Sequence, residues 1–395
     1  MSGNAAPDQG PGGDQQLMAR LFSPAARADP YPLYQDAPLP GCRHAIASRM
    51  LKDPRLGPPM LGLETANELM WRTFARWLLN LDGDRHRAMR QRFARIFTPG
   101  RVERYRPAIE ARAHALIDAV AATGQMDLVT DFARPLPFAI VTSVLGVPED
   151  RRPWLAERMH TLDTGFAHQH DPNAVATTSG AVREMLDYFS ELLDQRARAP
   201  QDDLMSRLAA DPPADDEGRA DLLANCVFFI NAGHITTSSL ITGGFLLLLE
   251  KPEQLARLRQ NPGLVPNAVE EMLRLVSPVS VVLCRARNDV EIDGYHVAAG
   301  QQRVVFPAGA NRDPSAFTDP GTFDLGRSPN PHLAFSAGAH FCLGAPLARL
   351  HGEVTINVLL ERLPGVRLAG KPEWLGSIPL RVPEHLPIAW RPSRQ

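Results

Sequence analysis

The chain has 395 residues, of which 44% are hydrophobic and 22% are charged, a composition that excludes a globally disordered protein. Its 42 basic and 44 acidic side chains leave a formal net charge of −2, so no charge excess attracts nucleic acid or an anionic membrane. No two of the four cysteines, at 42, 226, 284 and 342, are spaced as a CxxC motif. This spacing argues against a disulfide framework and a zinc ribbon.

The N-terminal residues 1–15 are rich in Gly, Pro, Asp and Gln and have no basic start and no apolar stretch. They predict a disordered leader rather than a signal peptide. The longest apolar run lies at 245–249 and stops at Glu250, which makes it too short to span a bilayer. We therefore expect a cytoplasmic protein without membrane contact, in which residues 16–395 form a single domain without internal repeats.

Helical periodicity dominates the chain. Apolar residues recur every three or four positions, which predicts helices over 84–96, 107–122, 131–144 and 181–196, and a short one from Leu204. Pro99-Gly100 is expected to end the first of these. An almost uniformly apolar segment, 221–250, predicts a central helix. Further helices are expected at 252–260 and 265–276.

Strand-like alternation is confined to the C-terminal part. It surrounds the turn Asp293-Gly294 within 280–297 and returns at 302–306. Residues 363–390 are rich in proline and predict only short β segments. The expected fold class is therefore mainly α with a small β subdomain.

The most informative stretch is residues 335–349, which read FSAGAHFCLGAPLAR. Gly338 and Gly344 permit a close backbone approach, so that N–H groups can converge on the sulfur of Cys342. This cysteine precedes a predicted helix that runs to Leu360, whose N-terminal dipole favours a thiolate. A lone cysteine in a glycine-rich turn is more often a buried structural residue, but here every neighbour fits a metal-bound thiolate. A zinc site would need ligands at spacings that this loop lacks.

The loop resembles the haem-binding signature of the cytochrome P450 family, in which Phe, Gly, His or Arg, Cys and Gly stand at fixed spacing. The chain matches it at Phe335, Gly338, His340, Cys342 and Gly344. Ser336 stands where the family often has glycine. The resemblance implies a haem b cofactor with Cys342 as the iron ligand, which favours O–O cleavage. It also implies that His340 contacts a haem propionate and that Phe335 and Gly344 line the cofactor.

Glu271 and Arg274 are three residues apart on one predicted helix face, by itself a common surface pair. About seventy residues before the cysteine, they match the family's ExxR motif, and Arg327 matches the third member of that charge network. The tetrapeptide 311–314, Asn-Arg-Asp-Pro, also has a family counterpart. The resemblance implies that the three charged residues support the haem loop structurally.

His86 and Arg90 are four residues apart on a predicted helix. Alone they would predict a solvated basic face. The family has an HxxxR pair here that binds the haem propionates, and Phe97-Thr98-Pro99 follows as expected. Arg90 is the stronger candidate, because a guanidinium pairs bidentately with a carboxylate.

Within the central helix, Ala232, Gly233, Thr236 and Thr237 resemble the family's oxygen-binding segment. Taken alone, two threonines and a glycine are also consistent with an ordinary buried helix that has no catalytic role. By the resemblance they form the catalytic set: small residues let the helix pass close to the haem, and the Thr236 hydroxyl opens a local helix bond and donates to oxygen.

Two positions depart from the family at the expected site. Ile235 stands where relatives carry Asp or Glu and cannot relay protons, so protons are expected through water or a polar group of the substrate. Cys284 stands where an arginine is expected when Asp289 is the anchor. Arg285 or Arg287 could substitute only through a register shift, since adjacent strand residues face opposite ways.

A third departure concerns the substrate side. Only about twenty residues separate Tyr34 from Asp53, where relatives fit a β-hairpin, so the hairpin is expected to be shortened. Either this opens the entrance to large or carrier-attached substrates, or the loop is simply trimmed. The family's substrate-contacting segments are apolar here and predict a hydrophobic small molecule. The expected pocket residues are Phe228, Val279, Val282, Leu283 and Ile378.

The function implied is a haem-thiolate monooxygenase of bacterial secondary metabolism that hydroxylates, epoxidises or otherwise oxidises a hydrophobic substrate. Without a fused electron-transfer domain, NAD(P)H would act only indirectly, through a ferredoxin reductase and a ferredoxin, and Arg349 is a candidate contact for the acidic ferredoxin. Two alternatives remain: a peroxide-driven haem enzyme, favoured by Ile235, and a non-catalytic helper, which would be expected to lack Cys342.

Overall fold

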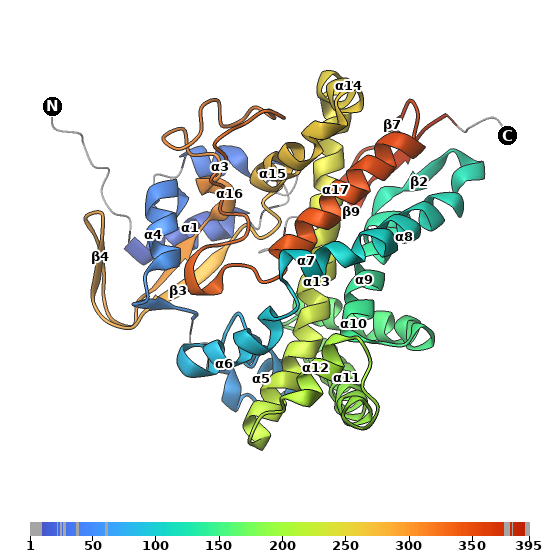
Figure 1. The fold of residues 1–395 in the computed structure, drawn as a ribbon. Coiled ribbons are helices and arrows are strands. Elements are labelled where there is room, and N and C mark those ends of the chain that lie inside the picture. The colour runs from blue at the N-terminus through green and yellow to red at the C-terminus, as the bar shows by residue number, and fades with distance from the viewer. Residues whose placement is uncertain are drawn as a thin grey trace. The chain divides into compact units, whose positions relative to one another are not determined.

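The computed structural model describes residues 10–21, 23, 26, 29–36, 39–59, 62–374, 380 and 382–391. Ile378 of the predicted pocket and residues 1–9 of the predicted leader lie outside these ranges. Helices make up most of the described chain, and the strands are short (Figure 1). This confirms the fold class predicted from the sequence.

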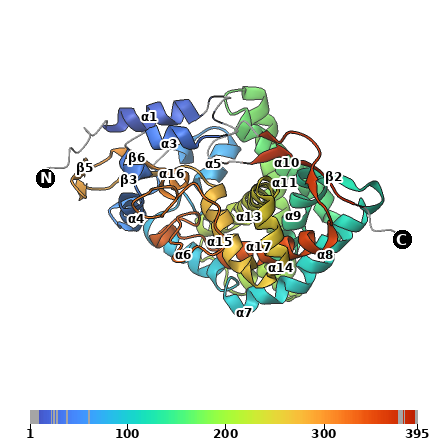
Figure 2. The same ribbon diagram turned by 90° about the horizontal axis from the view of Figure 1, so that it is seen from above.

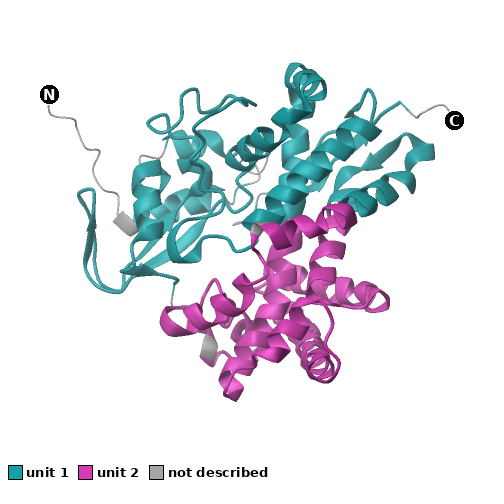
Figure 3. Ribbon diagram, viewed as in Figure 1, with its two compact units in different colours: residues 1–59, 110–133, 236–395 teal, residues 60–109, 134–235 magenta. Residues whose placement is uncertain are grey.

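The chain forms two compact units, and neither is continuous in sequence (Figure 3). Unit 1 comprises residues 1–59, 110–133 and 236–395, and unit 2 comprises 60–109 and 134–235. The last boundary falls inside a single helix, α13 (Asp216–Glu250). The single domain expected for residues 16–395 stays a prediction.

Every strand that the structure describes belongs to unit 1. The first sheet has the order β1-β3-β6, all antiparallel, with strands β1 (Leu56–Gly57), β3 (Val282–Ala286) and β6 (Gln302–Val305). The hairpin of β4 (Val290–Ile292) and β5 (Tyr295–Val297) turns at Asp293-Gly294 as predicted, and both turn residues have the positive φ that such turns need. The remaining strands are β2 (Gln125–Asp127), β7 (Arg367–Leu368), β8 (Glu373–Trp374), β9 (Pro383–His385) and β10 (Pro387–Ala389).

Unit 1 also contains helices. They are α1 (Gly10–Leu21), α3 (Tyr31–Asp36), α4 (His44–Lys52), α8 (Arg106–Asp118, which begins in unit 2), α14 (Pro252–Gln260), α15 (Val265–Val276), α16 (Pro307–Ala310) and α17 (Ala345–Arg362). Of these, α1 and α4 contact the strands. The sequence predicted α8, α14, α15 and α17, and it missed α1, α3 and α4.

Helix α1 corrects the prediction of a disordered leader over residues 10–15. It lies along the edge strand β6 (Figure 2). Asp14 is buried there, accepts a hydrogen bond from Val304 N at 3.1 Å and lies 3.6 Å from the Arg303 guanidinium. The prediction failed because a polar, glycine-rich segment is stabilised by contacts that are distant in the sequence.

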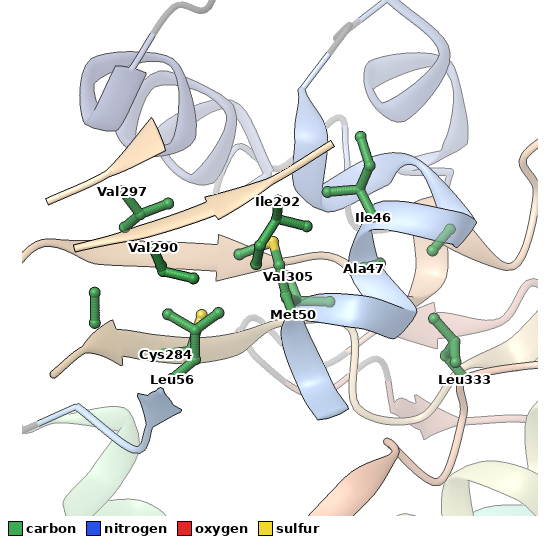
Figure 4. Packing of buried hydrophobic residues seen from close by; sticks show 12 residues of the cluster. Ile46, Ala47, Met50, Leu56, Cys284, Val290, Ile292, Val297, Val305 and Leu333 are labelled. Atoms are coloured by element: carbon green, nitrogen blue, oxygen red, sulfur yellow. The ribbon is translucent and has the colours of Figure 1, made fainter. Parts of the chain in front are cut away.

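One apolar cluster of unit 1 joins α4 to the strands (Figure 4). Its buried side chains come from α4, β1, β3, β4, β5 and β6, and they include Ile46, Ala47, Met50, Leu56, Cys284, Val290, Ile292, Val297 and Val305. The cluster fixes α4 against the sheet, and α4 in turn contacts the 3-10 turn Gly338–His340 that precedes Cys342.

Unit 2 is built from helices alone, as far as the structure describes it. They are α5 (Leu69–Ala75), α6 (Gly83–Ala94), α7 (Pro99–Val102), α9 (Pro135–Leu145), α10 (Arg152–Ala167), α11 (Pro172–Arg198), α12 (Leu204–Ala210) and the first part of α13. Pro99 begins α7 instead of ending a helix, as proline readily does at a first helical position. Residues 128–133, partly expected in the helix over 131–144, form a π-helical turn before α9. Helices α5, α7 and α10 were not predicted.

Helix α13 has 35 residues, a length of about 52 Å. It and the stretch Leu128–Leu145 are long and apolar enough to cross a membrane by length and composition. In the structure, 67% and 61% of the tested residues of these two helices are buried within the protein. A core helix of a globular protein meets the same criterion, so the finding is weak support for a membrane span.

Candidate functional site

The loop before Cys342 is held by its own backbone. Cys342 N donates to Phe335 O at 2.9 Å, and Phe341 N donates to Gly338 O at 3.1 Å. Ser336 and Gly338 both adopt positive φ, at 60° and 68°. The serine that stands in place of the family's glycine therefore takes the conformation for which glycine is usually needed.

Gly338 is required for a second reason. A Cβ atom at this position would overlap the carbonyl oxygen of Leu51 in α4. The backbone of the loop therefore lies directly on the backbone of α4, which the apolar cluster fixes to the sheet. A larger residue would lift the loop that carries Cys342.

Cys342 differs from the other three cysteines. It is partly exposed, whereas Cys42, Cys226 and Cys284 are buried. Burial raises the pKa of the Cys42 and Cys226 thiols above their usual range and raises that of Cys284 to about 12, so these three are inert apolar side chains. Cys342 also lies three residues before α17, at whose N-cap position Gly344 stands. A Cβ on Gly344 would lie 3.9 Å from the Cys342 sulfur, so the glycine borders the thiol.

The ExxR network forms behind this loop, within unit 1. Arg274 donates from Nε and Nη2 to the two carboxylate oxygens of Glu271, each at 2.7 Å, and both side chains are fully buried. Arg327 Nε lies 3.0 and 3.1 Å from the same oxygens. The remaining donors of Arg274 reach the carbonyl oxygens of Asn311, Pro320 and Thr322. The three predicted residues therefore do come together, and they bind the segment before the loop to α15.

The tetrapeptide 311–314 extends this support. Asn311 Oδ1 accepts from Leu333 N at 2.7 Å, and its Nδ2 donates to Ser277 Oγ at 2.8 Å. Asp313 Oδ2 accepts from His44 N at 2.7 Å, at the start of α4. These two side chains therefore accept hydrogen bonds from the backbone shortly before the cysteine loop, at Leu333, and at the start of α4, at His44.

A second charged cluster was missed from the sequence. Arg349 donates from Nε and Nη2 to Glu270 at 2.7 and 2.9 Å, and His332 Nε2 lies 3.1 Å from the same carboxylate. The Arg349 guanidinium also covers the Phe335 ring at 4.7 Å. Burial opposes ionisation of Glu270, but the hydrogen bonds from His332 and Arg349 outweigh it and hold the pKa at about 2. The Arg349 charge is thus already paired within the chain, which weakens its candidacy as a ferredoxin contact.

The four predicted catalytic residues lie on α13. Ala232, Gly233 and Thr236 are partly exposed in a helix that is otherwise largely buried, and Thr237 is 5% exposed. Ala232 and Thr236 are four residues apart and share a helix face. Within unit 2, a Cβ on Gly233 would lie 3.0 Å from Val141, so this glycine permits close packing of α9 on α13.

His86 and Arg90 lie on α6, whose N-terminus is capped by Asp82. His86 is only 4% exposed, and Arg90 is half-buried. The alternative of a solvated basic face is therefore wrong for this pair.

Aromatic rings gather around the predicted pocket residue Phe228 in unit 2. Its ring centroid lies 5.1 Å from that of Trp77. Trp77 in turn contacts Phe74 at 5.0 Å and Phe166 at 5.6 Å, and Trp71 lies 6.0 Å from Phe166. Sequence reasoning placed Phe228 near the substrate but missed Phe166 on α10.

The other pocket residues belong to unit 1. Val279 forms a β-bridge with Leu380. Val282 packs against the cluster that contains Cys284, whereas Leu283 packs against a different cluster that contains Val281 and Phe306. The two neighbours thus lie on opposite faces of β3, and each is partly exposed.

The expected arginine position is occupied by a core residue. Cys284 pairs with Arg303 across the sheet and lies in the apolar cluster (Figure 4). Arg285 points to the other face and donates to Gly300 O at 3.1 Å, and Arg287 donates to Pro54 O. A propionate contact by either arginine stays a prediction.

The region of the expected hairpin contains no strand between Tyr34 and Asp53 among the residues that the structure describes there, 34–36 and 39–53. A 3-10 turn, Pro40–Cys42, immediately precedes α4. Gly41 O accepts from Phe306 N at 2.9 Å, and a Cβ on Gly41 would overlap Val304 O. The shortened hairpin is confirmed, and the turn covers the end of β6.

Comparison with known proteins agrees with these features. The family model for cytochrome P450 matches residues 67–364. The chain is 39% identical over 290 residues to a biotin biosynthesis cytochrome P450 of Bacillus subtilis, covering 72% of each chain. It is 36% identical over 394 residues to the monooxygenase PikC of Streptomyces venezuelae, covering 93% of this chain and 92% of PikC.

A solved cytochrome P450 structure is also similar to this chain. P450BioI in complex with an acyl carrier protein that bears hexadec-9Z-enoic acid superimposes with a TM-score of 0.88 at 32% identity. The match covers 93% of this chain and 100% of that one.

The fold and the cysteine loop define a haem-thiolate protein of the bacterial type. The chain belongs to the cytochrome P450 family, and it is a monooxygenase that binds haem iron. The residues fit that cofactor: the one partly exposed thiol of the four lies just before the start of α17, beside Gly344.

Proposed function

We propose that Cys342 would hold the haem iron through its thiolate and that this chain oxidises a hydrophobic substrate, with electrons from a ferredoxin. The observation that carries the proposal is the Cys342 loop, in which a partly exposed thiol follows a turn that packs on α4 at Gly338, with the Glu271–Arg274–Arg327 network holding the segment before the loop. When bound, the haem supplies the oxygen-activating chemistry.

The side chains of the protein have separate tasks in this proposal. Cys342 binds the iron through its sulfur, while His340, His86 and Arg90 provide cationic or hydrogen-bonding partners for the propionates. Ala232 and Gly233 leave room on α13, and the Thr236 hydroxyl holds a proton at Oγ1. The apolar residues Phe228, Val279, Val282 and Leu283 exclude water and orient the substrate.

The test of the iron ligand is a Cys342→Ser variant. Reduced, carbon monoxide-treated wild-type protein should show the spectrum of a thiolate-ligated haem, and the variant should lose it while its far-UV circular dichroism stays unchanged. A Cys226→Ser variant, which changes a buried thiol of α13, serves as the control. A thiolate-type spectrum in Cys342→Ser would reject the assignment.

The substrate class is narrowed by two features of this chain. The 3-10 turn Pro40–Cys42 lies where a hairpin was expected, and Phe228 of α13 packs on Trp77, which in turn contacts Phe166 of α10. A solved relative binds an acyl chain attached to its carrier protein. We therefore include long acyl chains attached to a carrier among the substrates of this enzyme.

Binding can be measured by the shift that a bound substrate would cause in the spectrum of the ferric haem. A long-chain fatty acid, the same acyl group on acyl carrier protein, and carrier protein without an acyl group form the comparison. Tighter binding of the acylated carrier than of the free acid supports the proposal. Equal affinity for the free acid and the acylated carrier would indicate that the carrier protein is not recognised and that the substrate is a free hydrophobic molecule.

The electron donor can be tested in the same preparation. Turnover with NAD(P)H, a ferredoxin reductase and a ferredoxin should exceed turnover with hydrogen peroxide. The reverse result would favour the peroxide-driven alternative that Ile235 suggests.

A further inference from the structure

Ile235 stands where the resemblance to the family predicts a carboxylate beside the oxygen-binding segment, and a carboxylate of α10 reaches the same part of α13. Asp163, on α10, accepts a hydrogen bond from Asn231 Nδ2 at 2.9 Å. Asn231 and Ile235 are four residues apart on α13 and share one helix face. Asp163 therefore lies beside the face from which an acidic residue at 235 would project.

His234 completes this cluster in unit 2. Its Nδ1 lies 2.8 Å from Ile230 O, so Nδ1 carries the proton and Nε2 is the accepting nitrogen. Nε2 lies 3.9 Å from Asp163 Oδ2, a gap that one water or a small side-chain movement closes. The ring packs edge-on against Phe138 of α9 at 5.7 Å, which fixes its orientation.

The protonation states suit proton transfer near neutral pH. Burial raises the pKa of Asp163 to about 7, against the opposing hydrogen bond from Asn231 and the positive charge of Arg134. Burial also lowers the pKa of His234 to about 4. At pH 7 the histidine is therefore neutral, and Asp163 occurs in both its protonated and ionised forms, as an efficient general acid does.

The surroundings of Asp163 contain few other charges. Arg134 precedes α9, and His234 lies on α13. Where α11 packs on α10, Thr178 lies against Gly165 and donates to Thr161 O at 3.2 Å. The charged groups of this contact, Arg158 and Glu184, pair with each other at 2.9 Å. About a third of the Asp163 side chain, 32%, is accessible, so water can reach the carboxyl group.

We propose that Asp163, positioned by Asn231 and facing His234, delivers protons in place of the acidic residue missing at 235. The inference rests on the proposed function. Each turnover of a monooxygenase consumes dioxygen, two electrons from the redox partner and two protons, and it places one oxygen atom in the product and one in water. Asp163 gives a proton through water toward the segment of α13 that carries Thr236, and it regains one from solvent.

Asp163 could have a purely structural role, in which it only holds Asn231. An isosteric variant distinguishes this role from proton delivery. Asp163→Asn keeps a side-chain oxygen that accepts from Asn231 but has no titratable proton. Ile235→Asp returns a carboxylate to the family position. Asp187→Asn, on the exposed side of α11, removes the same charge from the same unit and serves as the matched control.

The first measurement is coupling, the product formed per NAD(P)H oxidised, together with hydrogen peroxide released. We expect Asp163→Asn to lose coupling about tenfold or more, the double variant with Ile235→Asp to recover it, and Asp187→Asn to match the wild type. Wild-type coupling in Asp163→Asn, in protein with a normal thiolate-type carbon monoxide spectrum, overturns the inference.

The second measurement does not depend on turnover. Infrared difference spectra between about pH 6 and about pH 8, on either side of the Asp163 pKa of about 7, should show a protonated carboxyl band that disappears in Asp163→Asn. Absence of a carboxyl group titrating in this range also overturns the inference. Failure of the proposed function is recognised separately, since the wild-type protein would then lack the thiolate-type spectrum.

Discussion

At the scale of single residues, buried charge is concentrated where the Cys342 loop is supported. Glu271 and Arg274 are both completely buried, and every hydrogen bond that Arg274 donates goes to this carboxylate or to a carbonyl oxygen of the chain. Such a pair costs free energy to bury, and its loss leaves an uncompensated charge. The pair therefore fixes the geometry of the loop more than it adds stability.

Glu271→Gln should unfold much more easily than the wild type. It leaves Arg274 and Arg327 facing a neutral amide, and the expected loss is about 3–5 kcal/mol. Urea unfolding followed by circular dichroism measures this, with Asp84→Asn, from the exposed Asp84–Arg87 pair, as the control. Equal unfolding midpoints for Glu271→Gln and Asp84→Asn would contradict the assigned role.

Glu270 predicts a pH dependence of stability. Its folded pKa of about 2 lies below the ordinary value of 4.5, so its ionised form stabilises the folded state above about pH 4.5, and this contribution is lost as the pH falls toward 2. Glu270→Gln should therefore lower Tm at neutral pH, and its difference from the wild type should shrink as the pH falls through this window. A difference that is constant with pH would show that the charge is not involved.

At the scale of elements, the sequence predicted the long helices well because apolar periodicity and end signals are local. Helices α14 and α15 have the predicted bounds. Helix α11 begins at Pro172, nine residues earlier than expected, because Asp171 caps it and α10 packs along it.

Elements stabilised by distant partners were missed. Helix α1 depends on Asp14 reaching Val304 and Arg303, and α4 is fixed by a cluster drawn from five strands. The same limit applies to the site. The motif residues Glu271, Arg274 and Arg327 were found by their spacing, whereas Asp163 belongs to no local pattern and acquires a role only by its contact with α13.

The contact of the cysteine loop with α4 gives a prediction at this scale. Gly338→Ala places a Cβ on the Leu51 carbonyl in a backbone conformation that itself costs about 1–2 kcal/mol. We expect loss of stability and weaker haem retention. Gly344→Ala, whose φ is −78° and whose nearest neighbour lies at 3.9 Å, should be far less destabilising in the same unfolding assay. Equal losses would show that the close approach to α4 is unimportant.

At the scale of the whole molecule, haem binding and folding are coupled. A ligand that binds the folded state alone stabilises it by about 4 kcal/mol when present at about 1,000 times its Kd. Protein depleted of haem should therefore have a Tm lower by roughly 5–10 °C. Adding haem back should restore Tm in the wild type and less so in Cys342→Ala. An unchanged Tm after depletion would mean that the fold does not depend on the cofactor.

The division into two units also determines how this enzyme can be recombined with its relatives. Unit 2 comprises two separate segments, and the chain crosses the boundary at 59–60, 109–110, 133–134 and 235–236. The last crossing cuts α13 between Ile235 and Thr236, so an exchange there would pair the threonine of one parent with the proton-delivery side chains of another. Chimeras that keep α13 from a single parent preserve the match between Asp163 and position 235 only if α10 comes from that parent as well.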